Sequence, residues 1–157
     1  MTEPIDPTNP VVALCAEGMA VEGTPGAARP LFEQAWDARR DDYDAAIAAH
    51  FLARHQPTPE DTLRWNDLAA RHAERVGDGR ADALLPSLYL NLGDALAGVG
   101  QLAPALDAAR RARDRLDALP HDGYRAFVLL GIDRLIERLC PGDERSLEPG
   151  ESPCDPP

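Results

Sequence analysis

The sequence predicts an all-α protein of about seven helices, arranged as three helical hairpins followed by a single C-terminal helix. Helix start signals recur along the chain, because a polar capping residue stands directly before a proline at Asn9, Thr24 and Thr58. No stretch alternates apolar and polar residues over the length of a strand. Small and apolar residues also return at a spacing of 34 residues, a period that is typical of helical-hairpin repeats.

Each expected helix begins at such a signal or after a loop, and ends at a glycine, a proline or a polar turn. Pro30 lies inside the second expected helix and predicts a local bend, since proline removes a helical hydrogen bond. Pro86 lies inside the fifth, where it marks either a bend or the true start of the helix. In chain order the expected helices are 10–22, 25–39, 43–55, 59–76, 80–99, 101–119 and 122–139.

The most informative motif combines apolar residues, two glycines and three alanines: Tyr89, Leu92, Gly93, Leu96, Gly100, Ala105, Ala109 and Ala112. Gly93 lets the following helix pass close, and Gly100 supplies the positive φ that ends a helix. The order and spacing of the motif resemble the tetratricopeptide repeat, a helix–turn–helix unit of about 34 residues. The resemblance reaches from about residue 10 to residue 120 and implies a right-handed solenoid of helical hairpins. A lone terminal helix usually caps such a stack.

The second of the three expected repeats departs most from this pattern. It carries His50, Thr62 and Asn66 at positions that hold Ala16, Ala28 and Phe32 in the first repeat, 34 residues earlier. His50 and Asn66 would then occupy facing positions of one hairpin, so we expect their side chains to form a hydrogen bond. The third repeat lies about nine residues further along than the period requires, which places an insertion around 77–85.

Composition and net charge disfavour some classes of partner. The net charge is −11 and the sequence pI is about 4.7, which disfavours nucleic acid and anionic membranes and favours a neutral or basic protein or peptide. No apolar run approaches the roughly 18 residues that span a bilayer, and residues 1–10 do not form a secretory signal. Three cysteines without metal-type spacing favour a reducing compartment, so we expect a cytoplasmic protein. Residues 1–8 are expected to form a flexible arm, 9–140 the helical domain and 141–157 a disordered acidic tail.

The sequence gives little indication of catalysis, a cofactor or a metal. His50 and His55 are five residues apart, which puts them roughly 140° apart around one helix and prevents joint chelation. Cys15 falls on a packing face and is expected to be an inert buried thiol. There is no glycine-rich phosphate loop and no nucleophile elbow. We therefore expect a protein that is not an enzyme.

The family resemblance implies a protein-interaction module that binds a peptide or protein segment in a concave groove formed by the first helix of each repeat. Carrying the repeat register across gives the groove residues Glu17, Val21, Ile47, Phe51, Arg54, His55, Leu90, Asn91 and Asp94. One alternative is a small enzyme or ligand-sensing domain that uses His50, His55 or Arg54 in a pocket. Another is a subunit that forms a homodimer through helix 122–139. The apolar face of that helix consists of Tyr124, Phe127, Val128, Leu129, Ile132, Leu135, Ile136 and Leu139.

Overall fold

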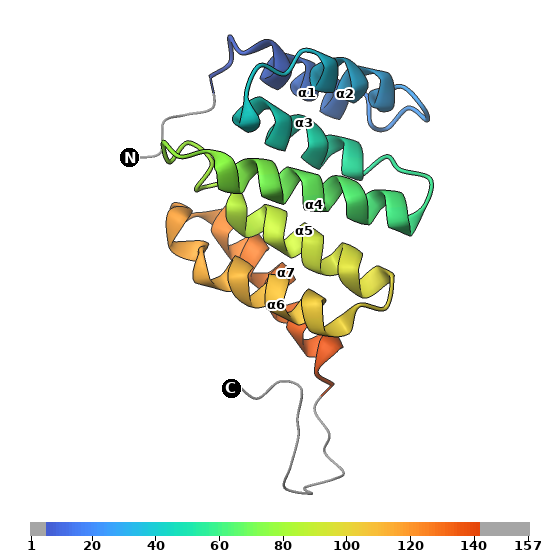
Figure 1. Cartoon of the computed structure of the whole chain (residues 1–157). Helices are drawn as coiled ribbons and strands as arrows, with labels where there is room; N and C mark the ends of the chain where they lie inside the picture. Colours follow the sequence, from blue (N-terminus) through green and yellow to red (C-terminus); the bar gives the residue numbers. More distant parts are fainter. Residues whose placement is uncertain (1–5, 142–157) are drawn as a thin grey trace, which may run out of the picture.

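The computed structural model describes residues 6–141, and over that range the protein contains seven α-helices, one short 3-10 helix and no strand (Figure 1). The all-α class is therefore confirmed. The expected tail, apart from Pro141, and most of the expected N-terminal arm lie outside the described residues. The elements are α1 (Pro10–Ala20), α2 (Ala28–Asp37), α3 (Asp42–Ala53), α4 (Pro59–Arg75), α5 (Leu85–Gly98), α6 (Leu102–Asp114), η1 (Leu116–Ala118) and α7 (Gly123–Leu139).

Helices that follow one another in the sequence pack on one another in space (Figure 1). The pairs α1–α2, α3–α4 and α5–α6 form extensive contacts, and α4 joins the second pair to the third by packing on α5. Among the odd-numbered helices, α1 packs on α3 and α5 packs on α7. No comparable contact joins α3 to α5 in the described part of the chain. The row formed by α1, α3, α5 and α7 therefore opens between α3 and α5.

Most helices begin and end close to the expected residues, and side-chain caps account for several of these ends. The side chains of Asn9 and Thr58 cap α1 and α4 by accepting hydrogen bonds from Val11 N and Asp61 N. The expected start at Thr24 is wrong, because turns continue to Ala27 and α2 begins at Ala28 without a side-chain cap. Pro30 consequently lies in the first turn of α2, where its missing N–H removes no helical hydrogen bond.

Two clusters of buried side chains form the core. The N-terminal cluster joins α1, α2 and α3, and consists of Val11, Cys15, Ala28, Phe32, Ala35, Ile47, Ala48 and Leu52. The C-terminal cluster contains residues from each of the helices α3 through α7 and is rich in alanine and leucine. Four half-buried side chains contact both clusters: Trp36, Tyr43, Trp65 and Leu84. The two clusters are thus connected mainly through aromatic groups at the junction of the first two helix pairs.

Two helical glycines mark close approaches between elements. A Cβ at Gly93 would lie 3.2 Å from the Ala105 carbonyl oxygen of α6 and 2.8 Å from a methyl group of Leu135, which confirms that α6 passes close to this residue. A Cβ at Gly18 would lie 2.3 Å from Cε1 of Phe32. Gly18 therefore provides the space for the Phe32 ring in the N-terminal core.

Gly18→Ala is expected to lower the free energy of unfolding by up to about 2 kcal/mol. Overpacking a closed core costs about 1–3 kcal/mol, and the gain in helix propensity returns about 1 kcal/mol. Gly98→Ala is the matched control, because a Cβ there would meet nothing within 4 Å. Urea titrations should show the first variant to be less stable than the wild type and the second to be no less stable. Equal stability of the two variants would show that Phe32 moves aside at no cost.

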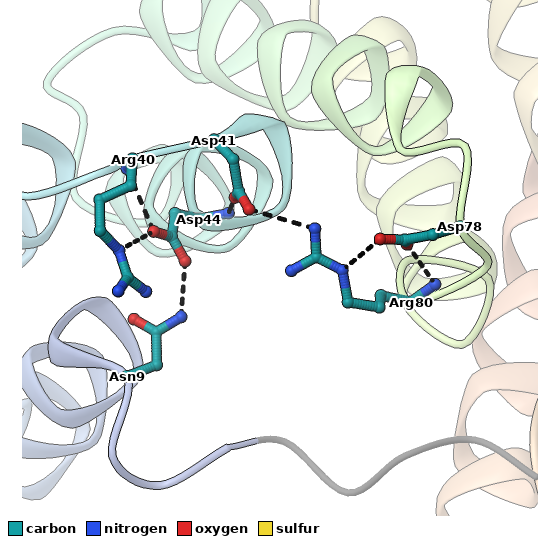
Figure 2. Close-up of polar contacts among 6 residues, drawn as sticks. All are labelled: Asn9, Arg40, Asp41, Asp44, Asp78 and Arg80. Carbon is teal, nitrogen blue, oxygen red and sulfur yellow. Dashed lines mark hydrogen bonds and ion pairs between the residues drawn. The ribbon is translucent and has the colours of Figure 1, made fainter.

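Polar contacts at the start of α3 tie three segments together (Figure 2). Asp44, only 1% exposed, accepts a 2.6 Å hydrogen bond from Asn9 Nδ2, while its second carboxylate oxygen accepts from the backbone N and the Nε of Arg40. Asp41 caps α3 by accepting from Asp44 N, and it also pairs at 3.1 Å with Arg80 from the segment before α5. The start of α1, the α2–α3 connection and the 76–84 segment are thus held at one point.

Candidate functional site

A mostly apolar hollow of about 230 Å³ lies across the odd-numbered helices, at the place where α3 and α5 separate. Met19 and Tyr124 are 46% and 50% exposed and contribute large hydrophobic groups to its lining from α1 and α7. The lining residues are Val12, Cys15, Ala16, Met19, Ala46, Ile47, His50, Phe51, Leu84, Ser87, Leu88 and Tyr124. The hollow therefore offers hydrophobic side chains from four different segments to a single occupant.

His50 contributes a titratable ring to this hollow. Burial, together with the nearby charge of Arg54, lowers the pKa of His50 to about 4, so the ring is neutral at pH 7. Its Nδ1 lies 3.3 Å from Nδ2 of Asn91, which bridges α3 and α5. The expected hydrogen bond between His50 and Asn66 is not formed, because Asn66 donates instead to the Thr62 carbonyl of its own helix.

The groove residues taken from the repeat register are divided among several locations. Ile47 and Phe51 line the hollow. Arg54, Asn91 and Asp94 instead line a second, shallower depression of about 490 Å³ beside the α3–α4 connection. Glu17 is exposed on α1, and Val21 packs half-buried against the N-terminal core at the end of the same helix.

Leu90 is not available to a partner. It is only 8% exposed, and its Cδ2 lies 2.7 Å from the position that a Cβ on Gly131 would occupy. The register placed Leu90 on the open face because it took no account of α7, which packs against α5 there. Leu90 is therefore a core residue in this structure.

Phe51, Arg54 and His55 are held by contacts within the protein. The Phe51 ring stacks on Phe32 with a centroid distance of 5.2 Å. Glu22 accepts from Arg54 at 2.9 Å through one carboxylate oxygen and lies 3.0 Å from His55 Nε2 through the other. Phe51, which the register assigned to the groove, therefore also packs on the N-terminal core, and the Arg54 guanidinium is already engaged by an acid.

Several lining residues were not identified from the sequence. Leu84 lies within the insertion expected at 77–85, and Leu88 lies between that range and the start of the motif at Tyr89, so the motif covers neither residue. Tyr124 belongs to the helix that was assigned a capping role, and Met19 falls outside the motif positions. A run of apolar residues around an insertion is the available signal, and it does not distinguish a pocket wall from ordinary core.

The apolar face of α7 is partly covered by the protein itself. Val128, Ile132 and Leu135 are buried in the C-terminal core. The large hydrophobic residues of α7 that remain exposed are Tyr124, Phe127, Leu129 and Leu130. The face proposed for a homodimer is therefore narrower than the sequence predicts and is centred nearer the start of the helix.

Residues 6–141 provide neither a metal-binding cluster nor a membrane-spanning helix. This part of the chain contains no group of three or more histidine, cysteine or acidic side chains placed to hold a metal ion. None of its helices is both long and apolar enough to cross a membrane. Burial raises the pKa of the Cys15 thiol to about 12, so at pH 7 it carries its proton and is a poor nucleophile.

No protein-family model, curated protein or solved structure matches the chain.

Proposed function

We propose that this protein is an interaction module of the tetratricopeptide-repeat type, which binds a protein or peptide segment along the face formed by α1, α3 and α5. Three features support the proposal: the 34-residue spacing, the motif between residues 89 and 112, and the helix pairs that follow one another in order. In this proposal the pairs form a right-handed solenoid, the protein acts in the cytoplasm, and α7 closes the stack.

The observation that carries the proposal is the apolar hollow between α3 and α5. Binding segments are usually anchored by one or a few large side chains that fill a pocket near the centre of the interface. The hollow has this character, because half-exposed Met19 and Tyr124 adjoin a lining that is otherwise mostly apolar. A single hydrophobic side chain of the partner would fill it, while the backbone of the segment crosses the odd-numbered helices.

Charge favours a basic segment. The chain has a net charge of −11, and Glu17 is exposed on α1, the helix that contributes Val12 and Met19 to the hollow. Asp94 on α5 is balanced by Arg138 at 2.5 Å, as Arg54 is by Glu22. Lysine or arginine residues beside the anchoring side chain would therefore be attracted by the overall field of the protein. Association should slow as salt is added, since surface charges steer the encounter.

Ala16→Trp is expected to weaken peptide binding about tenfold or more, because the indole would occupy the hollow. Ala16 is exposed on α1, so the substitution should leave the melting temperature nearly unchanged. The measurement is selection of random peptides against the wild type, followed by affinity titration of the enriched sequences. These should combine one large apolar residue with flanking lysine or arginine.

Ala103→Trp provides the matched control, because Ala103 is equally an exposed helical alanine but lies on α6, outside the lining of the hollow. This variant should bind the selected peptides as the wild type does. Ala126→Trp tests the exposed face of α7 in the same way. Peptides that bind the Ala16 variant normally but not the Ala126 variant would contradict the proposal and identify α7 as the interface.

A further inference from the structure

The polar groups that line the hollow differ in what they can offer an occupant. Ser87 Oγ donates to the Leu84 carbonyl at 3.0 Å, and the Cys15 thiol is 2% exposed. Tyr124 is half-exposed and therefore adjoins solvent. His50 is the remaining polar side chain of the lining; it is largely buried, and the protein uses only one of its ring nitrogens, Nδ1, in the contact with Asn91.

The hydrogen bond to Asn91 determines which nitrogen of His50 carries the proton. The Asn91 Nδ2 group can only donate, so the nearby Nδ1 of His50 is the acceptor. A neutral imidazole has one N–H, which must then be on Nε2. Within residues 6–141, no buried polar side-chain atom lacks a partner, yet no hydrogen bond satisfies this Nε2. Nε2 therefore has accessible surface, and the hollow is the described pocket that His50 lines.

The size of the hollow limits the occupant to one ring or one large side chain. Drug-sized ligands occupy pockets of about 300–1,000 Å³, and an engineered apolar cavity of about 150 Å³ holds benzene. The volume of the hollow, about 230 Å³, lies between these two volumes. The occupant must also be uncharged, because the lining provides no opposite charge to compensate an ion removed from water.

We propose that the hollow selects an uncharged, ring-sized hydrophobic group that carries a hydrogen-bond acceptor, which accepts from the Nε2–H of His50. This proposal rests on the proposed function and specifies its anchoring group. In a peptide the acceptor is a tyrosine hydroxyl or the backbone carbonyl beside the anchoring side chain. In each case the donor is already oriented by Asn91 before the ligand arrives, so little further ordering is needed on binding.

Acetophenone and ethylbenzene test the proposal directly, because they have nearly the same shape and only the first carries a carbonyl acceptor. Acetophenone is expected to bind the wild-type protein about 2- to 10-fold more tightly than ethylbenzene does, which is the gain in affinity expected from one net hydrogen bond. The measurement is titration by heteronuclear NMR. The chemical shift of His50 Nε2 should move with acetophenone and stay in place with ethylbenzene.

His50→Phe removes the donor while keeping an aromatic ring, and should abolish the preference for acetophenone. His50→Gln keeps an N–H donor at this position and should retain part of the preference for acetophenone. Equal affinities of the two compounds for the wild type, a preference that survives in His50→Phe, or no binding of either compound would each overturn the proposal. The proposed function is judged separately, by whether Ala16→Trp blocks the selected peptides. If Ala16→Trp blocks the selected peptides but the two compounds bind the wild type with equal affinity, only the role of His50 is refuted and the proposed function stands.

Discussion

Asp44→Ala is expected to lower the free energy of unfolding by about 2–5 kcal/mol. The change leaves two donors without an acceptor, the Nδ2 of buried Asn9 and the backbone N of Arg40. An unsatisfied buried donor costs about 1–3 kcal/mol. The Arg40 guanidinium also loses its partner but is largely exposed and can be hydrated, so it adds little.

Urea titration of three variants tests this expectation. Asp44→Asn keeps one oxygen for Asn9 but turns an NH₂ group toward Arg40, so its stability should fall between that of the wild type and that of Asp44→Ala. Asp107→Ala is the matched control, since Asp107 lies on an exposed helical position and its loss should change stability by no more than about 0.5 kcal/mol. A loss below about 1 kcal/mol for Asp44→Ala would show that water replaces the network.

The difference between Asn9 and Asp44 indicates how far local sequence predicts this fold. Asn9 caps α1 through contacts within two residues, so its role could be predicted from the residues beside it. Asp44 holds Asn9 across 35 positions of sequence, and nothing near Asp44 distinguishes it from a solvated helical acid. Start signals therefore predict the beginnings of α1 and α4, whereas a buried carboxylate becomes identifiable only when another helix covers it.

The candidate site shows the same limit. The repeat register assigned Ile47 and Phe51 to the open face, and both residues line the hollow. It did not predict the burial of Leu90, because that depends on α7 packing over α5 beside Gly131. The hollow lies where α3 and α5 separate, and part of its lining comes from the 76–84 segment, near the point where the 34-residue spacing lapses. Features that depend on a departure from the repeat cannot be derived from the repeat.

Phe32→Ala is expected to lower the free energy of unfolding by about 3–5 kcal/mol, the usual cost of removing a fully buried aromatic ring. Phe32 is fully buried, stacks on Phe51 at 5.2 Å and lies 5.1 Å from His55 between ring centroids. Phe127→Ala makes the same chemical change on α7, where the ring is 71% exposed. Its effect should not exceed about 0.5 kcal/mol.

Hydrogen exchange should show where Phe32→Ala acts. Phe32 belongs to the N-terminal cluster, which is connected to the C-terminal cluster mainly through half-buried side chains such as Trp36 and Trp65. Amides of α1, α2 and α3 should therefore lose protection, while those of α5 and α6 keep it, because regions with separate cores can open separately. Uniform loss of protection through α6 would show that the two clusters unfold as one unit. Equal losses of stability in Phe32→Ala and Phe127→Ala would contradict the assignment of Phe32 to the core.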